Sequence, residues 1–131
     1  MQGMTGANDK IRLVMSIVPQ GYYLANSCNY ILPSHLIDLY CLLGFLNSKT
    51  INWFFRCFST NSNVNGYEVD NFPIPQLSPN AQATISELVK KVIDAKRTNS
   101  STDTSAIEKQ IDELVYQAYE LSKDDIKIIE Q

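Results

Sequence analysis

The stretch of sequence that decides the fold runs from Leu36 to Phe58 and reads LIDLYCLLGFLNSKTINWFFRCF. It is the longest apolar stretch of the chain, and polar or charged residues interrupt it at Asp38, Asn47, Ser48, Lys49, Asn52 and Arg56. Interruptions of this kind are typical of a buried core and not of a membrane span. We therefore expect this stretch to pack inside a globular domain.

The spacing within this stretch predicts two helices. Pro33 and Ser34 precede it and provide a helix start, with Ser34 as the expected N-cap. Apolar residues then recur at helical spacing as far as Asn47. A second helix is expected to begin at Ser48 and to reach Phe58, with its aromatic residues in the core.

The residues before this stretch carry strand signals. Ile11 to Val18 places apolar side chains at every second position, which is the period of a half-buried strand. Pro19-Gln20-Gly21 is a turn signal, and 22–24 and 29–32 are further short segments rich in aromatic and β-branched residues. These patterns predict a small antiparallel sheet.

The residues after this stretch become helical again. A polar loop, 59–66 (STNSNVNG), leads to a brief expected strand at 67–69 and to the stiff Phe72-Pro73-Ile74-Pro75 segment. Amphipathic patterns over 81–97 and 107–119 then predict two helices that form an antiparallel hairpin, and a short last helix follows Ser122.

The sequence thus predicts an α+β fold: a small β-rich region, a helical pair and a C-terminal antiparallel helical hairpin. The expected first unit covers residues 1–78, and the hairpin covers 79–131. Within the first unit, the β-rich part is 1–32, the helical pair is 34–58, and the polar loop with the proline segment is 59–78.

Charge is distributed unevenly along the 131 residues. The chain has 11 basic and 14 acidic residues, a net charge of −3, which argues against a nucleic-acid partner. Up to Gly66, however, four basic residues stand against two acidic ones, a net of +2, and the remainder has seven against twelve, a net of −5. Any surface for a polyanion is therefore expected in the first half.

Cysteine and histidine usage argues against a metal site and a disulfide framework. Cys28, Cys41 and Cys57 are widely spaced without a C-x-x-C pair, and His35 is the single histidine. The N-terminus has neither the basic start nor the apolar run of a signal peptide. We expect a cytoplasmic protein with no metal, no membrane partner and no catalytic constellation of its own.

Several motifs in a fixed order carry a family resemblance. They are Thr5-Gly6-Ala7-Asn8-Asp9-Lys10, Gly21-Tyr22-Tyr23-Leu24-Ala25-Asn26-Ser27, Leu43-Gly44-Phe45-Leu46-Asn47-Ser48-Lys49, Asn71-Phe72-Pro73-Ile74-Pro75, and the closing run from Ile107 to Glu130. In this order they resemble the TaqI-like C-terminal specificity domain of adenine-specific DNA methyltransferases, which occurs in type IIG restriction-modification enzymes. The L-N-S-K helix, the P-I-P segment and the long helix are also similar to target-recognition units of type I specificity subunits.

The resemblance implies a function in DNA recognition. Residues 1–78 would be the target-recognition region, binding double-stranded DNA and positioning an adenine for a catalytic methyltransferase domain in the same polypeptide. The Gly-rich S-adenosylmethionine loop, the N-P-P-Y-type motif and an endonuclease signature do not occur in this chain. S-adenosylmethionine and the methylation chemistry, with any DNA cleavage, would therefore belong to the parent enzyme.

Residue type and location select the candidate DNA contacts. They are Thr5, Asn8, Lys10 and Arg12 around the N-terminal loop, with Lys49, Arg56, Asn61 and Asn63 near the helical pair. Arg and Lys read guanine or hold phosphate, and Asn pairs with adenine. The alternative is a protein-interaction module, whose acidic helical hairpin docks a specificity region onto a catalytic domain or subunit. A stand-alone hydrolase is disfavoured because the catalytic motifs are missing.

Overall fold

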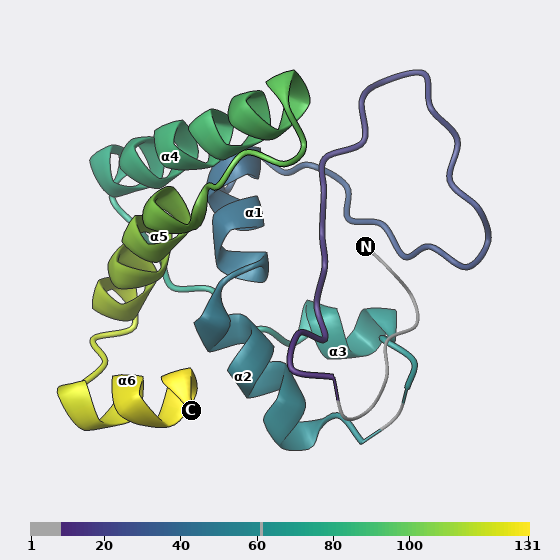
Figure 1. The fold of residues 1–131 in the computed structure, drawn as a ribbon. Coiled ribbons are helices and arrows are strands. Elements are labelled where there is room, and N and C mark those ends of the chain that lie inside the picture. Colours follow the sequence, from purple (N-terminus) through teal and green to yellow (C-terminus); the bar gives the residue numbers. More distant parts are fainter. Residues whose placement is uncertain (1–8, 61) are drawn as a thin grey trace.

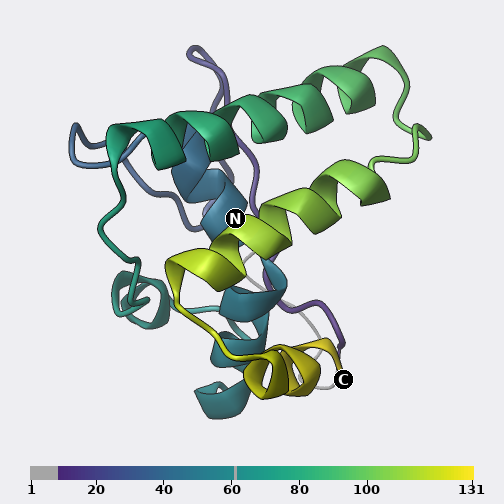
Figure 2. The same cartoon turned by 90° about the vertical axis from the view of Figure 1, so that its left-hand side faces the viewer.

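The computed structural model describes residues 9–60 and 62–131, and this part of the chain contains six helices (Figure 1). Their bounds are α1 Leu39–Leu46, α2 Lys49–Phe58, α3 Gly66–Asp70, α4 Pro79–Thr98, α5 Ser105–Ala118 and α6 Lys123–Glu130. Helices α4 and α5 form the expected hairpin, and Figure 2 shows them running side by side with a turn at one end.

Local capping explains where most helices begin. The Ser48 hydroxyl accepts from the Ile51 amide at 3.3 Å and starts α2, as expected. Ser122 and Asp125 form a capping box at α6, the short last helix expected after Ser122. Helix α1 differs, because it begins after Asp38, whose carboxylate accepts from the amides of Tyr40 and Cys41 at 2.9 and 3.1 Å. The Ser34 hydroxyl accepts from the Leu36 amide at 3.2 Å within a turn, so the expected N-cap role of Ser34 is wrong.

Two apolar clusters hold the helices together. The first joins the end of α1, helix α2 and helix α3 to the N-terminal segment, residues 9–37. Its buried residues are Leu13, Met15, Leu46, Ile51, Phe55, Val64, Val69 and Phe72. The second joins α1 to the α4–α5 hairpin: Cys41, Phe45, Ile85, Val89, Ile111 and Val115. The second cluster therefore packs residues from both sides of position 78 into one core.

A long irregular segment, residues 9–37, replaces the expected sheet. Within residues 9–60 and 62–131 no β-sheet forms, and only single bridge residues occur, at Cys28 and Asn63. The expected turn is present: Gly21 has φ 92°, and the Tyr22 amide bonds Pro19 O at 3.4 Å. After Met15 the segment forms a wide loop that extends away from the helices, to the right in Figure 1, without forming a strand.

The predicted α+β class is therefore wrong, because the described chain is helical with an extended segment. The alternation at 11–18 marks one-sided burial against helices: Leu13 and Met15 are buried against α2 and its neighbours. The alternation is imperfect as well, since Ile11 is 64% exposed and Arg12 only 1%. The brief strand expected at 67–69 is also wrong, because these residues lie in α3, where Glu68 accepts from the Asn65 amide at 2.8 Å.

Candidate nucleic-acid interface

Helix α2 positions the candidate interface. Its buried face consists of Thr50, Ile51 and Phe55, and its opposite face carries Arg56 in the last turn, exposed to solvent. The amphipathic spacing of the sequence produces this division, because residues four apart share one face of a helix. An arginine in the last turn also interacts favourably with the C-terminal end of the helix dipole.

Asn52 attaches the N-terminal segment to α2. Its side-chain Nδ2 donates to Lys10 O at 2.8 Å, and its Oδ1 accepts from the Arg12 amide at 2.8 Å. One side chain therefore satisfies both a backbone acceptor and a backbone donor, as a neighbouring strand would. The Lys10 side chain remains exposed.

Asn47, at the end of α1, makes a second attachment of the same kind. Its Oδ1 accepts from the Met15 amide at 2.8 Å, and its Nδ2 donates to Met15 O at 2.9 Å. The sequence marked Asn52 only as an interruption of the apolar stretch, and Asn47 as an interruption and as part of the L-N-S-K motif. Their amides, placed where an apolar residue would otherwise be expected, were the available signal for these attachments.

The Arg12 side chain is buried in the core. Its side chain is 1% exposed, its guanidinium carbon lies 5.0 Å from the centre of the Phe55 ring, and Nη1 donates to Ser59 O at 3.5 Å. The guanidinium thus stacks on α2 and contacts the residue that follows it. It lies inside the protein and not on the surface.

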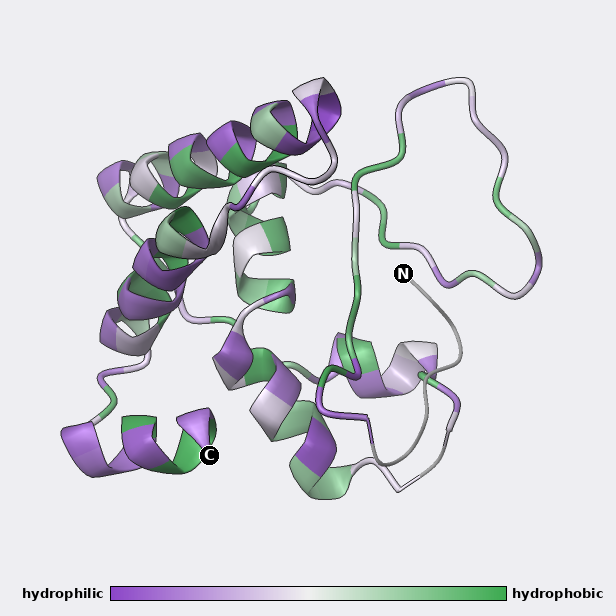
Figure 3. Ribbon diagram, in the orientation of Figure 1, coloured by the Kyte–Doolittle hydropathy of each residue, from purple (hydrophilic) through white to green (hydrophobic). Residues whose placement is uncertain are grey.

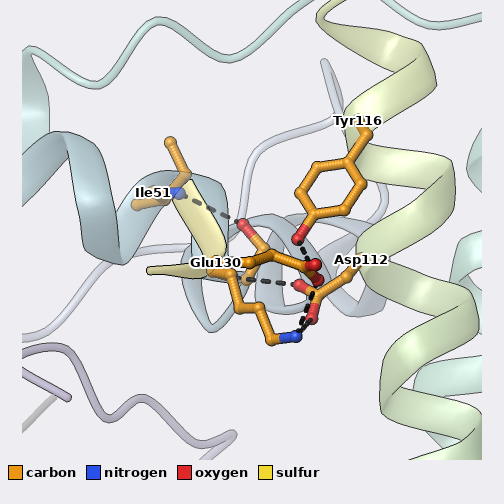
Figure 4. Close-up of polar contacts among 6 residues, drawn as sticks. Ile51, Asp112, Tyr116 and Glu130 are labelled. Atoms are coloured by element: carbon orange, nitrogen blue, oxygen red, sulfur yellow. Dashed lines mark hydrogen bonds and ion pairs between the residues drawn. The ribbon is translucent and has the colours of Figure 1, made fainter. Parts of the chain in front are cut away.

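Lys49, at the other end of α2, is tied to carboxylates. Its Nζ lies 3.1 Å from Glu130 Oε1 and 3.8 Å from Asp112 Oδ2, and its amide donates to Asp112 Oδ1 at 3.0 Å (Figure 4). The hydrogen bond with Glu130 raises the pKa of Lys49 and lowers that of Glu130. Burial raises the pKa of Asp112. The positive charge of Lys49 is therefore largely offset by its two partners.

The remaining candidates lie in the loop after α2 and near the N-terminus. Asn63 is exposed, and this part of the loop is fixed by Asn29, whose Nδ2 donates to Val64 O at 2.6 Å. Thr5, Asn8 and Asn61 lie outside the described residues. The structure thus places the Lys10 backbone on Asn52, one helical turn before the exposed Arg56, and places Lys49 and Arg12 in other surroundings.

The N-terminal segment exposes an unusual amount of apolar surface. Ten of the thirteen exposed large hydrophobic side chains of the described chain belong to it: Ile11, Val14, Val18, Tyr22, Tyr23, Leu24, Tyr30, Ile31, Leu32 and Leu36. Figure 3 shows hydrophobic stretches, in green, along this segment. Between it and α1 lies a cavity of about 270 Å³, lined by Met15, Val18, Leu24 and Leu42 among others.

Neither a metal site nor a membrane span is evident in the part of the chain that the structure describes. No group of three or more His, Cys, Asp or Glu side chains there is arranged to hold a metal ion. None of the described helices has the length and apolar character needed to cross a bilayer. Comparison with known proteins gives no match to this chain among family models, curated proteins or solved structures.

Proposed function

We propose that this chain is a DNA target-recognition domain that acts with an adenine-specific methyltransferase catalytic domain of the type IIG class. The proposal rests on the motif order described above and on two exposed cations, Lys10 and Arg56, which we call the cationic face of α2. S-adenosylmethionine would be bound by the catalytic domain, and a cytoplasmic location stays a prediction from cysteine usage.

The observation that carries the proposal is the pair of exposed cations, Lys10 and Arg56. Asn52 holds the Lys10 backbone against α2, and Arg56 follows Asn52 by one helical turn on the same face of the helix. Neither makes an ion pair with any residue in 9–60 or 62–131. Asp9 is the acidic residue nearest to Lys10 in sequence, and Glu68 is the one nearest to Arg56.

Charge separation along α2 supports the same interpretation. At the first turn of the helix, Lys49 is engaged by carboxylates from α5 and α6. At the last turn, Arg56 faces solvent beside a loop whose Thr60, Ser62 and Asn63 are exposed. Cations and neutral hydrogen-bonding side chains together suit contact with phosphate oxygens and base edges.

Removing the two cations tests the proposal. In Lys10→Ala/Arg56→Ala, we expect weaker binding to a fluorescently labelled mixed-sequence duplex. The plot of log affinity against log salt should become shallower by about two, because two phosphate contacts are lost.

A matched control removes the same charge elsewhere. Lys91→Ala/Arg97→Ala takes two exposed cations from α4, and binding should change much less. Equal weakening by both pairs would mean that only net charge matters and would remove the α2 face from the interface.

A second candidate function, docking onto a protein, is favoured by the exposed apolar segment. Residues 13–37 contain no Asp, Glu, Lys or Arg, and most of them are exposed. An uncharged apolar surface of this extent is typical of contact with protein and not with phosphate. The two functions are compatible, because they use different residues.

Docking is tested with the catalytic domain of the parent enzyme supplied as a separate chain. Tyr23→Lys/Leu32→Lys should weaken its binding, because Tyr23 is 100% and Leu32 74% exposed and each lysine would be desolvated at the contact. Binding to mixed-sequence DNA should not decrease. Undiminished binding of the catalytic domain would exclude these residues from the docking surface.

A further inference from the structure

We propose that Asn52 is a positioning residue for DNA binding, which fixes Lys10 beside Arg56 so that the two cations meet the phosphate backbone as a pair. This inference rests on the proposed function. It assigns a role to a neutral side chain, and it predicts a loss of DNA affinity without any loss of charge.

The Asn52 side chain makes hydrogen bonds to the backbone at Lys10, Arg12 and Leu13. Lys10 is exposed and lies two residues before the buried Arg12. Its carbonyl accepts from Asn52 Nδ2, and two residues later the Arg12 amide donates to Asn52 Oδ1, both at 2.8 Å. The Leu13 amide also approaches Oδ1, at 3.4 Å. A single amide group therefore bonds the backbone at Lys10, Arg12 and Leu13.

Asn52 lies on the same face of α2 as Arg56. Arg56 lies four residues further along the helix, which places it about one turn away on the same face. Asn52, the partner of the Lys10 carbonyl, thus lies one turn before Arg56 on the same face of α2. Only an amide serves here, because the bonds require one donor and one acceptor on the same short side chain.

Preorganisation explains why the attachment matters for binding. A lysine on a free segment loses conformational entropy when it is held on a phosphate, and a fixed backbone reduces that loss. Two cations at a fixed separation can also contact the same stretch of phosphates at once. Without Asn52, Lys10 would keep its charge but not its place.

Asn47 provides a matched control within the same chain. It also makes two hydrogen bonds to the extended segment, at 2.8 and 2.9 Å, but it holds Met15, five residues beyond Lys10. Asn47→Ala therefore removes two amide hydrogen bonds to the segment, whereas Asn52→Ala removes two of the same type and a longer one at 3.4 Å. A merely structural role would make the two variants alike in DNA binding.

The experiment is a double-mutant cycle on the full chain, with a labelled mixed-sequence duplex as the probe. We expect Asn52→Ala to lower the affinity by about as much as Lys10→Ala, and to reduce the salt slope by about one. Lys10→Ala should then add almost nothing in the Asn52→Ala background, because the same contact is already lost. Asn47→Ala should bind DNA nearly as well as the unsubstituted chain.

The possible failures are distinguishable. If Lys10→Ala weakens binding but Asn52→Ala does not, or if their effects simply add, the positioning role is overturned and the proposed function stands. If Lys10→Ala and Arg56→Ala both leave binding unchanged, the cationic face itself is overturned. Asn52→Ser is the second variant should Asn52→Ala fold poorly, because its short hydroxyl cannot span both backbone groups.

Discussion

Gly44 shows how closely two helices approach in the second cluster. A Cβ atom at this position would lie 2.9 Å from Ile85 Cγ2, 3.1 Å from Val89 Cγ2 and 3.5 Å from Ile111 Cγ2. Gly44→Ala should therefore destabilise the protein by about 1 kcal/mol in urea unfolding, because overpacking of about 1–3 kcal/mol outweighs the gain of about 1 kcal/mol in helix propensity. Gly66→Ala is the control: no atom lies within 4 Å, so its stability should be unchanged or higher. Equal effects would show that α1 and α4 do not pack this closely.

The type of a residue can be read from the sequence, whereas the contacts that surround it cannot. Lys10 and Arg56 are exposed, in keeping with their choice as candidate contacts. Arg12 could not be distinguished from them, because its burial depends on Phe55 and Ser59, more than forty residues away. The roles of Asn47 and Asn52 likewise depend on which backbone passes near them, and local sequence contains no information on that.

Polar contacts attach the C-terminal end of helix α6 to α2 and α5. None of its residues is buried, and Glu130 Oε1 bonds both Lys49 Nζ at 3.1 Å and the Tyr116 hydroxyl at 3.2 Å. Glu130→Ala should speed amide hydrogen exchange throughout α6 and leave α4 and α5 protected. The loss of stability should stay below about 1 kcal/mol, because the pair is partly exposed. Lys127→Ala breaks the exposed pair with Asp124 and should leave α6 exchange unchanged; equally fast exchange there would contradict a role specific to Glu130.

The pH dependence of this attachment has a definite sign. The hydrogen bond from Lys49 lowers the pKa of Glu130 from its ordinary 4.5, so the folded protein favours the carboxylate. This stabilisation is present above pH 4.5 and is lost as the pH falls through the lowered pKa. Exchange in α6 should therefore accelerate first as the solution is acidified, and in Glu130→Gln it should not follow pH in this way. An identical acid dependence in that variant would assign the effect to another carboxylate.

Whole elements were predictable where their signals are local. Ser48, Ser122 and the amphipathic spacing of 81–97 and 107–119 predict α2, α6 and the hairpin, because caps and helical periodicity act within a few residues. The lack of a sheet in residues 9–60 and 62–131 was not predictable. Alternation indicates only that one side of an extended chain is buried. Whether a strand or a helix covers that side depends on distant residues, and here Asn47 and Asn52 provide the bonds that a strand would provide.

At the scale of the whole molecule, the two clusters differ in their dependence on the N-terminal segment. The second cluster lies entirely within residues 41–115, whereas the first needs Leu13 and Met15. Residues 13–37 contain no Lys or Arg for trypsin, but Tyr22 and Tyr23 are 72% and 100% exposed. Brief chymotrypsin treatment should therefore cut after these tyrosines, as mass spectrometry would show, because exposed irregular backbone is the preferred site of proteolysis.

The cut chain should retain most of its helical circular dichroism signal, since α1, α4 and α5 keep their core. In urea the first cluster should then unfold before the second, seen as earlier loss of exchange protection in α2 and α3 than in α4 and α5. Resistance to chymotrypsin would instead mean that the apolar segment is already covered in solution, and its protection should then disappear in Tyr23→Lys/Leu32→Lys. Simultaneous unfolding of all helices after the cut would show that the two clusters form one cooperative unit.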